Sequence, residues 1–353
     1  MRPDTPCDPQ EVMLVDVEVV DEDEDLHGGG CWDEWHRPKT WDSVGYLSCL
    51  SGEGHSVMVR VTGFKPWLYI RIPRGRRGEQ IKAFYKQVED VLAGHPGKVG
   101  PVGWSHKHNL VGWEPGPGGE GTYRPIYGKV YFRSMGALRR AATALRRRRM
   151  DVFEDQVPAA HKLCCAHGFT HTGWLRIHSC SPVEWSMSSA QHEVECKVGS
   201  LVPLAIDRIA PLVLASFDLE CHSRDGGFPE PAKPSDPIIQ IGISVQRFGE
   251  AAPCQRIVLC LGATDPIEAA EIRCFDSERA LLDGFVHCMV DELDADVLLG
   301  YNVFNFDFSY LAERMLRLQA FSTYTPADRS LARSELRDLR QLRRLRGRGG
   351  PPA

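Results

Sequence analysis

The chain has 353 residues, of which 42% are hydrophobic and 25% charged, and its formal net charge at pH 7 is -5. This composition is that of an ordinary globular protein and excludes a disordered or fibrous chain. There is no apolar run long enough to cross a membrane and no signal-peptide pattern, so we expect a protein that is neither membrane-bound nor secreted. In that setting its 12 cysteines are expected to be reduced thiols.

A mixed-sheet α/β domain is expected over residues 11–177, after a loose N-terminus at residues 1–10. Alternating or apolar runs predict strands, and apolar residues at helical spacing predict helices. The expected strands are 12–20, 57–61, 67–72 and 130–132, and the expected helices are 80–92 and 135–149. The acidic run at residues 21–25 is expected to be a solvated loop.

The second of these helices is strongly basic, with arginines at positions 139, 140 and 146–149. Such a helix face could contact phosphates. The other interpretation is a solvated exterior whose cations interact favourably with the C-terminal end of the helix dipole. We prefer the second interpretation, and the sequence leaves both open.

Residues 178–208 contain few long apolar runs and are expected to form a polar connector. The pattern changes at residue 209, where buried strands and amphipathic helices are predicted up to residue 320. The expected strands are 212–220, 238–245, 256–261 and 297–300, and the expected helices are 277–293, capped by Ser277, and 308–318. Three strands, a helix, a strand and a helix are typical of a ribonuclease-H-like fold. The fifth strand and further helix that this fold needs are not evident.

Asp218 and Glu220 stand two residues apart, directly after the apolar run Leu212–Ala215. Residues two apart in a strand point to the same face, so both carboxylates are expected side by side at the end of a buried strand. Burying two like charges is unfavourable unless a cation lies between them. Carboxylate oxygens suit Mg²⁺ or Mn²⁺, and Asp307 offers a third acid on a later segment.

These strings resemble the exonuclease motifs of family B DNA polymerases, above all the delta type of eukaryotes and large DNA viruses. Residues 209–220, with 228–231 and 236–241, are similar to the first exonuclease motif. Residues 300–307 are similar to the second motif. Residues 152–155 and 173–175 are similar to the end of the family's N-terminal domain. The resemblance covers residues 11 to 320 approximately.

The resemblance implies a polymerase N-terminal domain followed by a partial ribonuclease-H-like 3′–5′ exonuclease domain. It implies two Mg²⁺ or Mn²⁺ ions, both contacted by the acid matching Asp218. The acid matching Glu220 would hold the ion that binds the attacking water, and the acid matching Asp307 would help to hold the second. Phe217 and Leu219, which alternate with the acids, are expected to pack in the core.

The second motif also borders the single-stranded 3′ end of the DNA in the family. Asn302 and Phe306 are therefore expected to contact DNA, and an aromatic ring can stack on unpaired bases. Core packing of Phe306 is the alternative.

The polymerising part of the family is absent from these 353 residues, since no palm motif occurs. Tyr324 and Asp328 match the letters of the third exonuclease motif, but Pro326 would break the helix that this motif needs. The chain is therefore expected to be the front part of a proofreading polymerase, with no nucleotide incorporation of its own. A sliding clamp is a further possible partner, through the missing C-terminal part. Members of the family act in the nucleus or at a viral replication site in the host, so the resemblance implies one of these locations for this protein.

The tail at residues 321–353 is rich in arginine. It is either a nucleic-acid arm or, as we prefer, the product of a break in the gene. Two other functions stay open for the whole chain. One is a non-catalytic nucleic-acid-binding fragment of a broken polymerase gene. The other is a free-standing ribonuclease-H-like exonuclease, for which the polymerase-like N-terminal domain is a poor fit.

Overall fold

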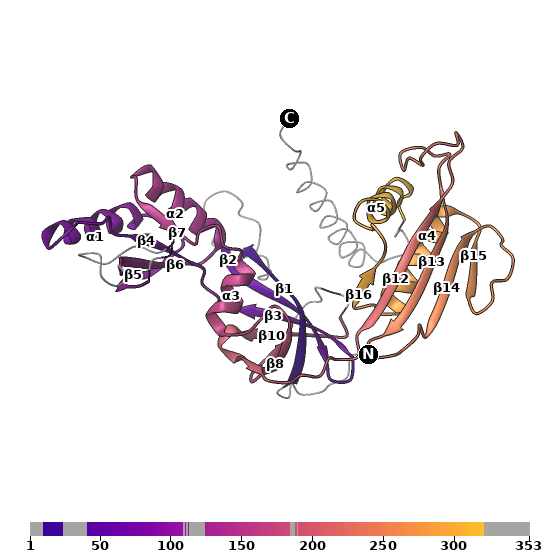
Figure 1. Ribbon diagram of the computed structural model, residues 1–353, viewed down its shortest axis with the longest axis horizontal. Coiled ribbons are helices and arrows are strands. Elements are labelled where there is room, and N and C mark those ends of the chain that lie inside the picture. The colour runs from indigo at the N-terminus through magenta and orange to yellow at the C-terminus, as the bar shows by residue number, and fades with distance from the viewer. Residues whose placement is uncertain are drawn as a thin grey trace, which may run out of the picture. The chain divides into compact units, whose positions relative to one another are not determined.

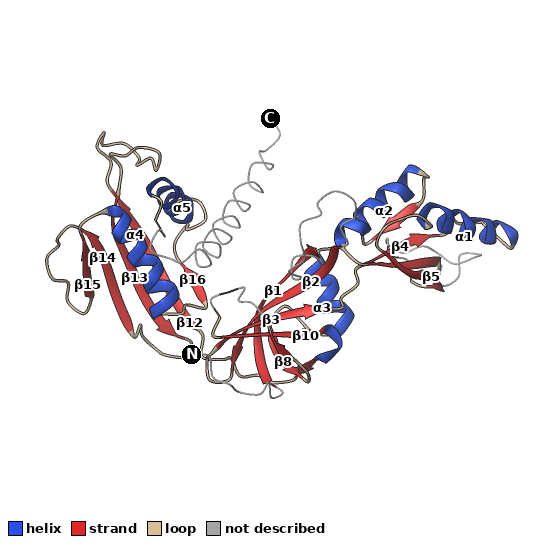
Figure 2. Cartoon of the chain, turned by 180° about the vertical axis from the view of Figure 1, so that it is seen from behind, coloured by secondary structure: helices blue, strands red, loops and turns tan. Residues whose placement is uncertain are grey.

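The computed structural model describes residues 10–23, 41–108, 110, 112, 124–183, 188 and 190–320. Contacts divide the chain into two compact units whose main boundary lies between Ile206 and Asp207, and the short segments Gly52–Ser56 and Trp185–Gln191 also belong to the second unit. Both units combine helices with sheets, which confirms the predicted α/β class (Figures 1 and 2). No helix among the described residues is long and apolar enough to cross a membrane. The expectations for residues 1–9, the Tyr324 string and the arginine-rich tail lie outside the described residues.

A seven-stranded mixed sheet forms the larger part of the first unit. Its order is β11-β8-β1-β2-β3-β10-β9, with β10 parallel to β3. The strands are β1 (Gln10–Asp23), β2 (Trp41–Ser51), β3 (Ser56–Thr62), β8 (Gly173–Ile177), β9 (Ser181–Pro182), β10 (His192–Lys197) and β11 (Leu201–Leu204). Helix α3 (Ala159–His167) contributes Leu163 and Cys164 to the core on this sheet.

The stretch 178–208, expected as a polar connector, therefore contains three strands of this sheet. In β10 the buried Val194 and Cys196 alternate with charged residues, so the strand has an apolar face without an apolar run. The thiols also differ in one place from expectation. Cys180 is disulfide-bonded, whereas the cysteines found free are 49, 164, 165, 196, 221, 254, 260, 274 and 288.

A four-stranded sheet with two helices completes the first unit. The chain order is β4 (Trp67–Arg71), α1 (Glu79–Leu92), β5 (Lys98–His106), β6 (Ile126–Phe132), α2 (Met135–Arg147) and β7 (Asp151–Phe153). This is a β-α-β-β-α-β unit, a recurrent supersecondary motif, with sheet order β5-β6-β4-β7. Phe84, Leu138 and Leu145 of the helices pack on one face of the sheet. On the other face, Trp67 and Tyr127 join the core of the larger sheet.

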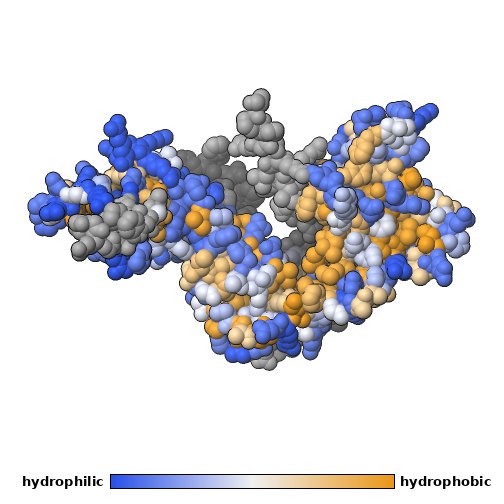
Figure 3. Space-filling model, viewed as in Figure 1, coloured by the Kyte–Doolittle hydropathy of each residue, from blue (hydrophilic) through white to orange (hydrophobic). Residues whose placement is uncertain are grey.

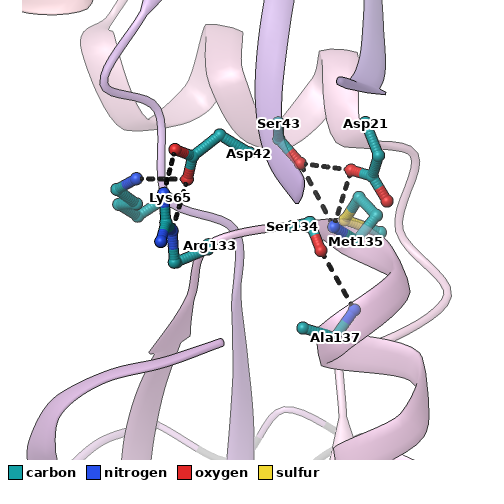
Figure 4. A network of polar contacts seen from close by, with 8 residues as sticks. All are labelled: Asp21, Asp42, Ser43, Lys65, Arg133, Ser134, Met135 and Ala137. Carbon is teal, nitrogen blue, oxygen red and sulfur yellow. Dashed lines mark hydrogen bonds and ion pairs between the residues drawn. The ribbon is translucent and has the colours of Figure 1, made fainter. Parts of the chain in front are cut away.

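The start of α2 is tied to the seven-stranded sheet by a polar network (Figure 4). Asp21 accepts hydrogen bonds from the backbone N–H groups of Met135 and Gly136, at 2.9 and 2.7 Å, and from the Ser43 hydroxyl at 2.7 Å. Asp42 accepts from Lys65 at 2.7 Å and from Arg133 at 2.7 and 3.1 Å.

The acidic run is thus not a solvated loop where it is described. Strand β1 extends to Asp23, and Asp21 satisfies backbone donors that a helix start leaves unpaired. A carboxylate there also interacts favourably with the positive end of the helix dipole.

The second unit contains a five-stranded sheet of order β15-β14-β13-β12-β16. Its elements are β12 (Val213–Cys221), β13 (Ile238–Arg247), β14 (Gln255–Leu261), β15 (Glu271–Phe275), α4 (Glu278–Val286), a π-helical turn (His287–Glu292), β16 (Val297–Leu299) and α5 (Asp307–Leu318). The predicted cap of α4 is confirmed, because the Ser277 side chain accepts from the Ala280 N–H at 3.2 Å. A fifth strand does exist: β15 lies parallel to β14, at the edge opposite β16.

Candidate functional site

Strand β12 presents its acids and its apolar residues to opposite faces. Ala215, Phe217 and Leu219 are buried, as the alternation predicted, while Asp218 and Glu220 are exposed. The two acids do share a face. That face is open to solvent, however, so the expected burial of two like charges does not occur. Burial therefore does not require a cation between Asp218 and Glu220.

Asp307 lies against the backbone of β12, between the positions of these two acids. It is the first residue of α5 and only 2% exposed. Its Oδ1 accepts a hydrogen bond of 3.2 Å from the Leu219 N–H. Strand β16 pairs with β12 only as far as Ser216, so the carboxylate takes up a backbone donor that the neighbouring strand no longer reaches.

Burial raises the pKa of the Asp307 carboxyl above its ordinary value, and the negative charge of Asp218 raises it further. The N–H groups of Leu219 and of Asp307 itself act in the opposite direction, since they favour the charged form. The charge of Asp218 therefore acts on the Asp307 carboxyl. A cation beside both would relieve the repulsion and favour ionised Asp307.

The turn before α5 brings the backbone close to β12. A Cβ added to Gly300 would stand 2.1 Å from Cγ1 of Val303 and 2.8 Å from the Phe217 carbonyl oxygen. Only glycine fits this approach without a shift of the backbone. Asn302 follows in the left-handed region at φ 59°, which asparagine tolerates better than most residues.

The carbonyl of Asn302 accepts from the N–H groups of Asn305 and Phe306, at 2.9 and 3.3 Å. Its side chain accepts a hydrogen bond from the Asn305 amide. Asn302 therefore closes the turn that leads into α5, and any contact with DNA would be made by a residue already engaged in the fold.

Aromatic rings hold α5 against the sheet and continue toward the surface. Phe217 contacts Phe308 of α5, with ring centroids 5.3 Å apart. Phe306 is half-buried and lies between Phe228 and Tyr310, at centroid distances of 5.2 and 5.3 Å. Phe306 thus packs partly on the core. Phe228 is 76% exposed, and its only signal in the sequence is its position before a proline in the first motif.

A buried ion pair holds the loop that carries Phe228. Arg314 of α5 is 3% exposed and binds Glu278 of α4 in a bidentate manner, with one contact of 2.7 Å from Nε. Its Nη1 also donates to the carbonyls of Pro231 and Lys233, at 3.2 and 3.0 Å. Glu278 in turn accepts from the Ile238 N–H at 2.9 Å. One arginine therefore joins two helices, the loop and the start of β13.

The donor chemistry of Asp218, Glu220 and Asp307 fits hard divalent cations such as Mg²⁺ and Mn²⁺. Within the part of the chain that the structure describes, however, no three or more His, Cys, Asp or Glu side chains are grouped closely enough to hold an ion. The three acids are neighbours on two elements without forming a closed ligand set. Binding would require side-chain movement or a further ligand.

A family model for the exonuclease domain of DNA polymerase family B matches residues 150–344, more than half of the chain. The DNA polymerase delta catalytic subunit of Oryza sativa subsp. japonica is 29% identical over 280 residues, which is 75% of this chain and 25% of the relative. The DNA polymerase of Acanthamoeba polyphaga mimivirus is 25% identical over 308 residues, or 81% of this chain and 18% of that protein. The chain thus spans a quarter or less of these relatives.

A solved structure is also similar, the family B DNA polymerase of the archaeon Pyrobaculum calidifontis. The TM-score is 0.54 at 19% identity, and the match covers 87% of this chain and 33% of that one. At this identity the likeness shows the fold alone.

Proposed function

This chain belongs to DNA polymerase family B through its exonuclease domain, and on that premise we propose that it is the N-terminal and proofreading region of a DNA-directed DNA polymerase. The proposed reaction is hydrolysis of the terminal phosphodiester at the 3′ end of a DNA strand. Relatives among delta subunits and viral polymerases favour a nuclear or viral replication site. A sliding-clamp partner remains a proposal for the whole polymerase.

The hydrogen bond between Leu219 and Asp307 is the observation that carries this proposal. It brings together two motifs that lie 88 positions apart in the chain. The pKa of Asp307 responds to the charge of Asp218, so the two motifs also share one electrostatic environment. A purely structural role for Asp307 would be served by a neutral acceptor, without this repulsion.

Asp218 is proposed to contact both metal ions, Glu220 the ion that binds the attacking water, and Asp307 the second ion. Two bound ions supply activation of water and neutralisation of the charge that develops on the phosphate. The chain itself orients the acids: β12 directs Asp218 and Glu220 to one face, and the Leu219 N–H holds one oxygen of Asp307.

The frayed 3′ end is proposed to lie against Phe228 and Phe306. Phe228 is largely exposed and contacts the half-buried Phe306 ring, so a base could stack on Phe228 without disturbing the core. Stacking on an aromatic ring is worth roughly 1–3 kcal/mol per base. Asn302, four residues before Phe306 in the sequence, would contact the strand while keeping its turn.

The test is digestion of a 3′-labelled single strand by the 353-residue chain with Mg²⁺ or Mn²⁺, together with Mn²⁺ binding followed by electron paramagnetic resonance. No acceptable third motif accompanies the first two, so we expect slow digestion. Asp218→Ala should abolish digestion and weaken Mn²⁺ binding at least about tenfold, because it removes the shared ligand. Asp265→Ala, an exposed acid on a loop of the same unit, is the matched control and should change neither.

The second candidate is a non-catalytic nucleic-acid-binding fragment. The open face of Asp218 and Glu220 and the lack of a closed ligand set among the described residues favour it. Binding of single-stranded DNA with no metal-dependent digestion, and no effect of Asp218→Ala on Mn²⁺ binding, would establish this alternative and exclude the exonuclease.

A further inference from the structure

One end of the β-α-β-β-α-β unit gathers arginines from two separate segments. Arg71 at the end of β4 pairs in the sheet with Asp151 at the start of β7. The segment that leaves β4 toward α1 and the segment that leads from α2 into β7 therefore emerge at the same end. We call residues 71–79 and 146–151 the arginine end.

The arginine end is strongly positive in a chain whose net charge is -5. It contains eight arginines, at 71, 74, 76, 77 and 146–149, against two acids, Glu79 and Asp151. Figure 3 shows a predominantly hydrophilic surface over α1 and α2. Such segregation of like charge is unfavourable for an isolated fold and is typical of a surface that meets a polyanion.

Internal partners account for only part of this charge. Arg146 is bound to Asp155, at 2.6 and 2.8 Å, and Arg71 to Asp151 at 3.2 Å. Arg76 lies over the Phe84 ring at 4.9 Å. The side chains of Arg77 and Arg147–Arg149 are exposed and form no ion pair with any residue that the structure describes.

Helix dipoles do not explain the cluster. Cations are favourable at the C-terminus of α2, but Arg74, Arg76 and Arg77 precede the N-terminus of α1, where the dipole disfavours cations. The N-cap of α1 is Gly78, which has no side chain to pair with the first N–H groups of the helix. The favourable dipole interaction considered for α2 therefore does not extend to the arginines that precede α1.

Arg149 adds an independent observation. It stands at φ 57°, directly after the C-cap of α2, and its N–H donates to the Arg146 carbonyl at 2.8 Å. Glycine is the usual residue at this position of a helix end, because a side chain is strained there. Strained backbone positions of this kind cluster at functional sites.

We propose that the arginine end binds the sugar–phosphate backbone of a nucleic-acid strand, at a surface separate from the exonuclease acids. Arginine suits this partner because its planar guanidinium forms paired hydrogen bonds to phosphate oxygens. The two aromatic rings here, Phe84 and Phe153, lie beneath Arg76 and Arg71, so no exposed ring among the described residues of this end could stack on bases. Binding is therefore independent of base sequence.

The test is fluorescence anisotropy of labelled poly(dT), and of a duplex of equal length, over a series of NaCl concentrations. EDTA is present so that the exonuclease acids hold no metal. The first variant carries Arg147→Gln, Arg148→Gln and Arg149→Gln. The second carries lysine at the same positions. The control carries Arg247→Gln, Arg256→Gln and Arg279→Gln, which removes three exposed arginines from the second unit. Every variant keeps the same C-terminal arginines, so differences report the substituted positions alone.

Loss of three phosphate contacts should reduce the slope of log K against log [NaCl] by about 2–3, and weaken binding at least about tenfold at low salt. The lysine variant should keep the slope, because its charge is unchanged. The control should resemble the wild type. A slope that changes by less than about 1 in the first variant, or an equal fall in the control, overturns the proposal. Poly-glutamate is added as a competitor of labelled poly(dT), against unlabelled poly(dT) of equal charge. If it competes equally well, the proposal is overturned and the arginine end is assigned to an acidic protein instead.

Discussion

The Leu219 N–H donates a hydrogen bond of 3.2 Å to Oδ1 of Asp307, at the point where β16 has ceased to pair with β12. One carboxylate thus completes a backbone ladder and stands beside Asp218. These two roles favour different protonation states. The fold needs only an acceptor oxygen, whereas metal binding needs the charge.

Asp307→Asn should raise the free energy of unfolding at pH 7 by roughly 1 kcal/mol, the usual size of a stabilising substitution. The amide oxygen can still accept from Leu219, while the buried charge is removed. Because the folded-state pKa of Asp307 is raised, its charge destabilises the fold at pH values above that pKa. The penalty disappears as the pH falls below the unfolded value of about 4, where the group is protonated in both states.

Urea denaturation of both proteins between pH 3 and 7 measures this difference, with Asp265→Asn as the exposed control. The variant should at the same time lose metal-dependent digestion. An equal stability difference at every pH would show that the charge of Asp307 is not the cause.

Gly300→Ala should destabilise the second unit by about 2 kcal/mol, as expected when a packed region receives an extra carbon. The new Cβ would meet the Phe217 carbonyl oxygen, which cannot rotate away. Gly242→Ala on β13 is the control, because a Cβ there would contact nothing within 4 Å. Thermal unfolding measures the stability of both variants. If the two substitutions had equal effects, the close approach of the turn to β12 would be wrong.

Arg314→Met should lower the free energy of unfolding by about 3 kcal/mol, because it leaves the buried Glu278 carboxylate without its cationic partner. Adding Glu278→Gln should recover part of the loss, since the unpaired charge is then removed. Arg317→Met, on the same helix, breaks only an exposed pair with Glu313 and should cost less than about 0.5 kcal/mol. Urea denaturation distinguishes these variants. A loss for Arg314→Met no larger than that for Arg317→Met would contradict the role of the buried pair.

Asp21→Ala should destabilise the first unit by roughly 1–2 kcal/mol, the range found when a helix start loses its side-chain acceptor. Met135, Gly136 and Ser43 each lose the Asp21 acceptor, and the Met135 N–H keeps a second contact, of 3.1 Å to the Ser43 hydroxyl oxygen. Asp21→Asn should cost less because it keeps an acceptor oxygen. Asp90→Ala, on the exposed side of α1, should have little effect. Amide hydrogen exchange in the first turn of α2 should become faster in Asp21→Ala. Unaltered protection there would contradict the proposed role of Asp21.

The alternation along β12 was predictable because it is local. Phe217 and Leu219 had to share one face, and Asp218 and Glu220 the other, once the segment was a strand. The cap at Ser277 was predictable for the same reason. What the pattern could not tell was that the face with the two acids stays open to solvent, since that depends on α4 and α5 packing on the apolar face.

The contacts that assemble the site could not be predicted from local pattern. The burial of Asp307 depends on where β16 ends, which is a matter of three-dimensional pairing. Phe228 became a candidate DNA contact only through its ring contact with Phe306, which is remote in the sequence. Strand β15 was missed because Glu271 and Arg273 interrupt its short apolar pattern.

The hydrogen bond from the Leu219 N–H to Asp307 also bears on which substitutions this codon would accumulate. Asparagine lies a single base substitution from aspartate and would keep the hydrogen bond to Leu219 while removing a buried charge. Under selection for folding alone, asparagine would therefore be the favoured replacement. An aspartate that persists here against that advantage records selection for negative charge, so sequencing this codon in related genes would separate lineages that still need the charge from lineages that keep only the fold.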